Sequence, residues 1–278
     1  MKLGSISQAF LCVFAPCVSI SVSSAQSPVP ARVAVEHYGV ASGTANTTTL
    51  RIEMDARNAE QSTLRVRGGT PGNIAGILIG SSPASLPLPF GMTLLVAPNA
   101  TPVFGVFDKN GRFALPIDLG DPQRVGQTLY CQGFQFQPPK DPKIGIIVFH
   151  LSQGMKVGFA KGNAQPNLTY NGPAFTAILM RETLGKDSAP SFAVLSRVLV
   201  PTAGYQLRHH GTQSTGGVTR IYLTLQPTNQ PQLQVVVSKR RFVTLAPRPA
   251  SKIEVWLNTS PWLPAYARAR AAVIQRDF

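Results

Sequence analysis

Side chains that could carry out chemistry are few in this chain of 278 residues. A Gly-x-Ser-x-Gly nucleophile elbow, a phosphate-binding loop and a zinc-binding His-Glu-x-x-His helix are all absent from the sequence. Asp and Glu number only 12, so a pair of carboxylates for glycoside hydrolysis would come from a small set. Glu53 and Asp55 are close in sequence, but both fall on the outward face of an expected strand. The sequence therefore predicts a protein that is not an enzyme, with a hydrolase of unrecognised type as an alternative.

Candidate metal ligands are equally sparse. His209 and His210 are adjacent on an expected strand, so their rings point to opposite faces and cannot readily share one ion. Asp118 and Asp121 flank Gly120, but calcium takes six or more oxygen ligands and no Asp-x-Asp repeat supplies them. We expect the two aspartates to form turns, and we expect no metal and no cofactor.

Positive charge is the strongest compositional feature, with a formal net charge of +14. It is concentrated after residue 160, where the sequence contains 14 Lys and Arg residues but only four Asp and Glu residues. Such a field attracts anionic glycans, lipopolysaccharide or acidic proteins. The candidate polyanion-binding residues are Lys239, Arg240, Arg241, Arg248 and Lys252. The alternative is that three like charges at a hairpin tip are only solvated. Aromatic residues of the kind that stack single-stranded bases do not interleave with this run, which argues against nucleic acid.

The first 25 residues have the pattern of a secretory leader. Lys2 precedes an apolar stretch from Ala9 to Val22, and Ser23 and Ala25 supply the small residues that signal peptidase reads. Because that stretch is shorter than the roughly 20 residues that span a bilayer, cleavage after Ala25 is favoured over an uncleaved anchor. We expect a secreted, periplasmic or cell-surface protein with no transmembrane span after cleavage. Cys131 would then be its only cysteine, without an internal disulfide, and we expect a small buried hydrophobe there.

The elements that would position any site are short strands. Pro and Gly number 24 each and separate short apolar runs, which is typical of an all-β protein. Phe113, Leu115 and Ile117 alternate with smaller or polar residues and predict one apolar face. Asn110-Gly111 predicts a type I′ hairpin turn between the strands on either side. Only the Ala-rich tail predicts a helix, which would either pack on the second domain or recognise a partner.

The chain is long enough for two antiparallel β-sandwich domains with a short C-terminal helix. The boundary falls where Gly, Asn and Gln replace apolar residues. The predicted divisions are a signal peptide at 1–25, a flexible arm at 26–46, an N-terminal sandwich at 47–151, a linker at 152–173, a C-terminal sandwich at 174–262 and a helical tail at 263–278.

Two resemblances add to this prediction. The runs Gly91–Pro98, Gly111–Pro116 and Val125–Gln132 resemble a repeated β-module of secreted planctomycete-type bacterial proteins, over Gly72–Gln137. That resemblance implies a β-fold and no particular activity. A second region, Ser196–Asn258, looks like the C-terminal β-domain of PrcB-type proteins. Its hairpin motif is Thr202, Ala203, Gly204 and Tyr205, with Ala203 where that family has glycine. This resemblance implies a domain that stabilises a partner protease.

The expected function is that of an exported, non-catalytic interaction or structural protein whose partner is another exported protein. The first alternative is binding of an anionic surface polymer through the basic C-terminal region.

Overall fold

The structure, a computed structural model, describes residues 32–43, 50–57, 61–137, 148–160, 175–185, 187–200, 204–228, 236–259 and 269–276. These residues are mostly in β-strands, with 70% strand and 3% helix, which confirms the all-β prediction. The helices they contain are two 3-10 turns, η1 Pro89–Gly91 and η2 Pro122–Arg124. Over the described ranges, no helix has the length and hydropathy that a membrane crossing requires.

Nine strands form the largest sheet. They are β1 Arg32–Tyr38, β2 Ser42–Gly43, β5 Ile74–Gly80, β8 Thr101–Val106, β10 Thr128–Gln137, β11 Val148–Ala160, β12 Phe175–Thr183, β13 Ser191–Val200 and β16 Val237–Thr244. Their order is β16-β13-β12-β1-β11-β10-β5-β8, and β2 pairs with β11. Neighbours are antiparallel except β1 and β12, which run parallel from Arg32↔Leu179 to Glu36↔Thr183.

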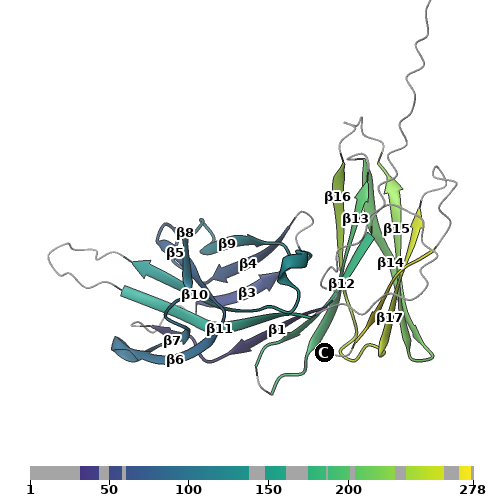
Figure 1. Cartoon of the computed structure of the whole chain (residues 1–278). Coiled ribbons are helices and arrows are strands. Elements are labelled where there is room, and N and C mark those ends of the chain that lie inside the picture. The colour runs from purple at the N-terminus through teal and green to yellow at the C-terminus, as the bar shows by residue number, and fades with distance from the viewer. Residues whose placement is uncertain are drawn as a thin grey trace, which may run out of the picture.

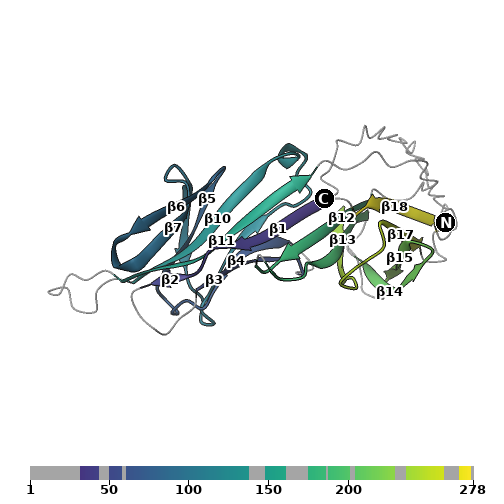
Figure 2. The same cartoon turned by 90° about the horizontal axis from the view of Figure 1, so that it is seen from below.

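Three smaller sheets accompany this long sheet. One contains β3 Arg51–Asp55, β4 Ser62–Arg67 and β9 Arg112–Ile117. A second, in the order β14-β15-β17-β18, contains β14 Tyr205–Thr215, β15 Val218–Pro227, β17 Lys252–Thr259 and β18 Ala269–Gln275. The third is the hairpin of β6 Pro83–Leu88 and β7 Met92–Val96. The molecule is elongated, with the three-stranded and four-stranded sheets toward opposite ends (Figures 1 and 2).

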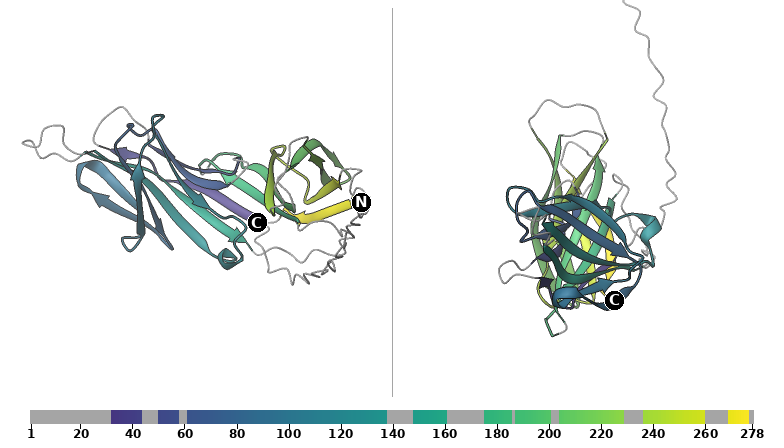
Figure 3. Two further views of the ribbon diagram at one scale, coloured as in Figure 1. Left: turned by 90° about the horizontal axis from the view of Figure 1, so that it is seen from above. Right: turned by 90° about the vertical axis from the view of Figure 1, so that its left-hand side faces the viewer.

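Two hydrophobic cores lie on opposite faces of the long sheet, and β12 contributes to both. Ile178 and Met180 pack into the first core, with residues of β1, β11 and the three-stranded sheet. Ala177 and Leu179 pack into the second core, against the four-stranded sheet. Because successive residues of a strand point to opposite faces, this alternation requires that the cores occupy different faces. The long sheet therefore joins both ends of the molecule (Figure 3).

Period-two alternation correctly located many strands. In β9, Ile117 is buried in the first core, and Phe113 and Leu115 pack against it. The predicted hairpin across Asn110-Gly111 is wrong, however, because β8 pairs with β5 and β9 pairs with β4. Asp108 Oδ1 accepts the backbone N–H groups of Asn110 and Arg112, at 2.8 and 2.9 Å. This turn carries the chain from one sheet to another rather than folding two strands together.

The predicted flexible arm at 26–46 is wrong for Arg32–Tyr38, which forms β1. Val33 and Val35 are fully buried in the first core, and they alternate with Arg32, Ala34 and Glu36. Surrounding Pro, Ser and Thr residues made this segment read as a loose chain, although it contains a period-two strand. The signal peptide at 1–25 and the rest of the arm before Arg32 lie outside the described residues.

The predicted linker at 152–173 is wrong as far as Ala160, because β11 continues to that residue. Met155, Val157 and Phe159 alternate as buried side chains of the first core. Gly154 belongs to the Gly-rich segment that suggested a loop. It lets the Tyr38 ring lie directly over the strand, because a Cβ at this position would meet Tyr38 Cζ at 2.4 Å. Residues 161–173 lie outside the described part of the chain.

The predicted helical tail at 263–278 is wrong for Ala269–Gln275, which forms strand β18, while residues 263–268 and 277–278 lie outside the described residues. Ala271, Ala272 and Ile274 are buried in the second core, and β18 pairs antiparallel with β17. Alanine favours helices in isolation, but burial and an available sheet edge outweigh that preference of a few tenths of a kcal/mol per residue. The described part of the tail packs on the second core, which was one of the two roles expected of it.

Candidate anion-binding pocket

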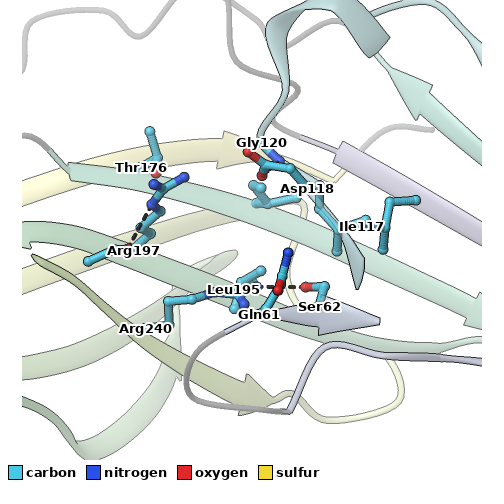
Figure 4. A pocket seen from close by; sticks show the side chains of 12 residues that line it. Gln61, Ser62, Ile117, Asp118, Gly120, Thr176, Leu195, Arg197 and Arg240 are labelled. Carbon is cyan, nitrogen blue, oxygen red and sulfur yellow. Dashed lines mark hydrogen bonds between the residues drawn. The ribbon is translucent and has the colours of Figure 1, made fainter. Parts of the chain in front are cut away.

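A small pocket of about 180 Å³ lies where the three-stranded sheet meets β12, β13 and β16 of the long sheet (Figure 4). One side of the pocket is lined by Gln61, which precedes β4, by Ser62, which begins β4, and by the turn from Ile117 to Gly120. The long sheet supplies Thr176, Ile178, Leu195, Arg197, Ser238 and Arg240. The apolar members of this lining are buried in the first core, so the polar side chains stand on a rigid base.

Arg197 on β13 and Arg240 on β16 are the charged groups of the long-sheet side. They are direct partners across the antiparallel pair of strands, so their side chains leave the same face of the sheet. Among the described residues, neither guanidinium lies within ion-pair distance of a carboxylate. Two like charges in this arrangement repel each other, and their position in a pocket favours a ligand of opposite charge.

Serine hydroxyls fix both guanidinium groups, as the dashed lines in Figure 4 mark. Arg197 Nε donates to Ser238 Oγ at 2.8 Å. Arg240 Nη2 donates to Ser62 Oγ at 2.6 Å, and Ser62 is completely buried. An arginine carries five N–H donors, so a single bond to serine orients the group and leaves donors for a ligand.

Burial lowers the pKa of Arg240 from its usual value, and the charge of Arg197 lowers the pKa further. The carboxylate of Asp118 acts in the opposite direction and raises this pKa. Because arginine titrates far above neutral pH, the guanidinium stays charged at neutral pH despite this lowering of its pKa. Its reduced hydration leaves a cation that gains more from an anionic partner than an exposed arginine would.

Asp118 closes the pocket on the side of the three-stranded sheet. Its Oδ1 accepts the Gly120 N–H at 2.8 Å, and Asp121 Oδ1 accepts the Gln123 N–H at 3.0 Å. Both aspartates therefore form turns as predicted, and Asp118 additionally faces the arginines.

The chemistry of this lining suits a carboxylate, sulfate or phosphate group. Guanidinium forks bind such planar or tetrahedral oxyanions through paired N–H donors. Serine and threonine hydroxyls add donors that can rotate to suit the ligand. Since drug-sized molecules need roughly 300 Å³ or more, a pocket of about 180 Å³ fits a small anion or the acidic end of a larger molecule.

The structure separates the five residues predicted to bind a polyanion. Lys239, Arg240 and Arg241 lie within strand β16 rather than at a hairpin tip, and Arg240 points to the face opposite the other two. Arg248 is exposed in the segment before β17. Lys252 Nζ pairs with Glu254 Oε1 at 2.9 Å on the four-stranded sheet. Only Arg240 of these five lines the pocket.

The hairpin motif is described only in part. Thr202 and Ala203 lie outside the described residues, while Gly204 precedes β14 and Tyr205 begins it. The Gly204 carbonyl accepts the N–H of Thr228 at 2.6 Å. β14 and β15 form a hairpin, with Gly216 and Gly217 at positive φ in its turn.

The other candidate groups lie apart from the pocket. Cys131 is fully buried in the first core, and burial raises the pKa of its thiol to about 12, which confirms a hydrophobic role. His209 and His210 are on β14, where His209 Nε2 lies 3.0 Å from Thr212 Oγ1. Within the described ranges, no three His, Cys, Asp or Glu side chains come close enough to hold a metal ion.

Sequence reasoning missed Arg197, Ser62 and Asp118 as pocket residues. One signal was present, since Arg197 interrupts the apolar run from Phe192 to Val200. A charged residue that interrupts a buried strand is unusual, because charged side chains are mostly exposed, and its position is therefore worth noting. Arg197 and Arg240 are 43 residues apart in sequence. They become neighbours only through the register of β13 with β16, which no local sequence pattern indicates.

No protein-family model, no curated protein and no solved structure matches this chain.

Proposed function

We propose that this protein is an exported, non-catalytic binding protein that takes an acidic group of its partner into the pocket between Arg197 and Arg240. The partner is an exported protein or a surface polymer that presents a carboxylate, sulfate or phosphate. The observation that carries the proposal is the direct cross-strand position of the two arginines in a pocket. Placing like charges together costs stability, and a bound anion would remove that cost.

Export and lack of catalysis are the parts of this proposal that come from the sequence. The leader over residues 1–25 supports export, and the absence of known catalytic motifs supports a binding role. The resemblance of Ser196–Asn258 to the PrcB-type β-domain makes an exported protease one class of partner for the proposal.

The division of the all-β fold into two units is also part of this proposal. We propose two sandwich-like units, each with one of the two cores, that share β12 and β13 of the long sheet. The pocket lies on the first core's face of those two strands, beside the three-stranded sheet. A ligand bound there would contact both the three-stranded sheet and the strands that lead into the second core.

A thermal-unfolding series with small anions tests the proposed function. Sulfate, phosphate, acetate and citrate are compared at constant ionic strength, with chloride as the reference. Binding to the native state alone raises the transition temperature with ligand concentration. We expect oxyanions to raise it for the wild type, and we expect the variants Arg197→Gln and Arg240→Gln to lose the effect.

Arg241→Gln is the matched control, because Arg241 is on the same strand and points to the opposite face. It removes the same charge without touching the pocket. Equal loss of the anion effect in Arg241→Gln and Arg240→Gln would show that general charge, rather than the pocket, binds the anion, and would disprove the proposal.

A further inference from the structure

A second and larger hollow lies beyond the ends of β1 and β12 and is independent of the anion pocket. It is a groove of about 1380 Å³. The parallel pairing of β1 with β12 ends at Glu36↔Thr183, and both chains then continue along the groove, as 37–40 and as 184–185. β3, β10 and β11 supply most of the remaining lining.

The charges of this groove are balanced in number, and Glu36 pairs with two of its three basic residues. Its lining contains three carboxylates and three Lys or Arg side chains, although the chain as a whole carries a net charge of +14. Glu36 accepts hydrogen bonds from Lys156 Nζ at 3.1 Å and from Arg181 Nη2 at 2.9 Å. These contacts lower the pKa of Glu36 against the opposing effect of burial. The groove therefore does not select a charged ligand, unlike the Arg197–Arg240 pocket.

A polar network also fixes the base of the groove. His37, whose side chain is only 6% exposed, lies 3.2 Å from Glu182 Oε1 through Nε2. Gln153 Nε2 lies 3.5 Å from His37 Nδ1 and donates to the Ile52 carbonyl at 3.1 Å. This network connects β1, β12, β11 and β3, so the groove is held open by bonded side chains rather than by loosely packed ones.

Two exposed aliphatic side chains border the groove. Val40 is 76% exposed and Leu184 is 72% exposed, and they are among the most exposed large hydrophobic residues of the described chain. Each follows the end of one of the two parallel strands. Apolar side chains at the edge of a polar, charge-balanced groove suit a ligand that carries both backbone amides and aliphatic groups.

An open strand edge is the third feature. β3 is an outer strand of its sheet, pairing only with β4 among the described strands, and Arg51, Ile52 and Glu53 of β3 line the groove. The Ile52 carbonyl of this edge points toward the groove, where it accepts the side-chain N–H of Gln153 at 3.1 Å, so a peptide that pairs there would take the place of that amide. Unpaired edges are where extended peptides add to a sheet.

From these features we infer that the groove binds an extended, uncharged polypeptide segment of a partner protein, which adds to the edge of β3 and places aliphatic side chains against Val40 and Leu184. The backbone bonds would supply affinity, and the aliphatic contacts would supply selectivity. The balanced lining predicts that this binding, unlike anion binding, changes little with salt.

Fluorescence polarisation with labelled peptides tests the inference on the full chain. The probe is a peptide of about 12 residues, long enough to pair with a whole strand, that contains only Ser, Thr, Asn, Val and Leu. Companion peptides carry Lys or Glu at half of the positions, and a neutral hexasaccharide serves as competitor. The test variant is Val40→Asp with Leu184→Asp, and the matched control is Val236→Asp, because Val236 is 70% exposed and outside the groove.

We expect the uncharged peptide to bind, the double variant to weaken binding by about tenfold or more, and the control to change it by less than about twofold. Hydrogen exchange on the wild type should show new protection of β3 amides when the peptide is present. The inference is overturned if the uncharged peptide does not bind, if Val236→Asp weakens binding equally, if only the Glu-rich peptide binds and salt abolishes it, or if the hexasaccharide displaces the probe. These outcomes leave the Arg197–Arg240 pocket untouched, because its ligand is an anion.

Discussion

Arg197 and Arg240 lie directly opposite each other on β13 and β16, with their side chains on the same face of the long sheet. Cross-strand partners have Cβ atoms about 5 Å apart, and like charges in this position destabilise a sheet. Fold stability alone would favour an acid, a hydroxyl or an apolar residue at one of the two sites. The presence of both arginines beside a pocket points to a role in binding.

Removing one of these charges should therefore cost little stability. We predict that Arg240→Gln leaves the free energy of unfolding in urea unchanged or raises it by up to about 1 kcal/mol, in buffer without oxyanions. Relief of the repulsion offsets the loss of the bond to Ser62. Arg241→Gln should have an effect within about 0.5 kcal/mol. A loss of more than about 2 kcal/mol in Arg240→Gln would mean that the arginine is a structural contact, contrary to this account.

Glu254 on β17 should make stability depend on pH in acid. The Glu254 side chain is 5% exposed, and its carboxylate contacts Arg220, Lys252 and Arg270 at 3.2, 2.9 and 3.3 Å. Burial opposes its ionisation, but hydrogen bonds from Lys252, Trp256 and Arg270 outweigh burial and lower the pKa to about 2. A carboxylate with a lowered folded pKa stabilises the protein above its unfolded pKa, and that stabilisation is lost as pH falls.

The window for this effect runs from about pH 4.5 down to about pH 2. We predict that Glu254→Gln lowers the free energy of unfolding by about 2 kcal/mol at pH 7, since the basic partners are about one-third exposed and screened by solvent. The difference from wild type should shrink toward zero near pH 2. A difference that stays constant across this range would show that the ion cluster contributes no pH-dependent stability.

The C-terminal strand should be part of the second core. Ile274 of β18 is 2% exposed and packs in that core, and the neighbouring Val273 points to the opposite face. We predict that Ile274→Ala lowers the free energy of unfolding by about 2–4 kcal/mol, because the truncation leaves a cavity. Val273→Ala, the matched control, should cost about 1 kcal/mol or less. Equal small losses in both variants would mean that β18 contributes little to the core.

The shared strands predict how the molecule unfolds. Because β12 and β13 place side chains in both cores, loss of one core should remove support from the other. We predict that Leu64→Ala in the first core and Leu223→Ala in the second each lower stability by about 3 kcal/mol and shift the same single transition. Differential scanning calorimetry checks this, and two transitions that respond separately would show independent units.

Local patterns in the sequence predicted much of the strand content but little of its assembly. Strands β3, β4, β9 and β17 follow period-two alternation, and their apolar residues are buried as expected. β1, β18 and the part of β11 after Leu151 were not recognised, because Pro-rich, Ala-rich or Gly-rich surroundings favoured other conformations. In each case burial against a distant strand decided the outcome, and that contact has no local signal.

The candidate site shows the same division. Arg240 was predicted because it belongs to the densest basic run, which is visible in the sequence. Its partners Arg197 and Ser62 are distant in sequence and are brought together by the registers of β13 with β16 and of β4 in the neighbouring sheet. Alternation along β16 also separates Arg240 from Lys239 and Arg241, which a count of charges could not show.

Isothermal titration of the full chain with inorganic phosphate measures whether the Arg197–Arg240 pocket binds an anion. We predict one phosphate per chain for the wild type and for Arg241→Gln, and no measurable heat of binding for the double variant Arg197→Gln with Arg240→Gln. Unchanged binding in the double variant, or its equal loss in Arg241→Gln, would contradict the assignment of the pocket as the anion site.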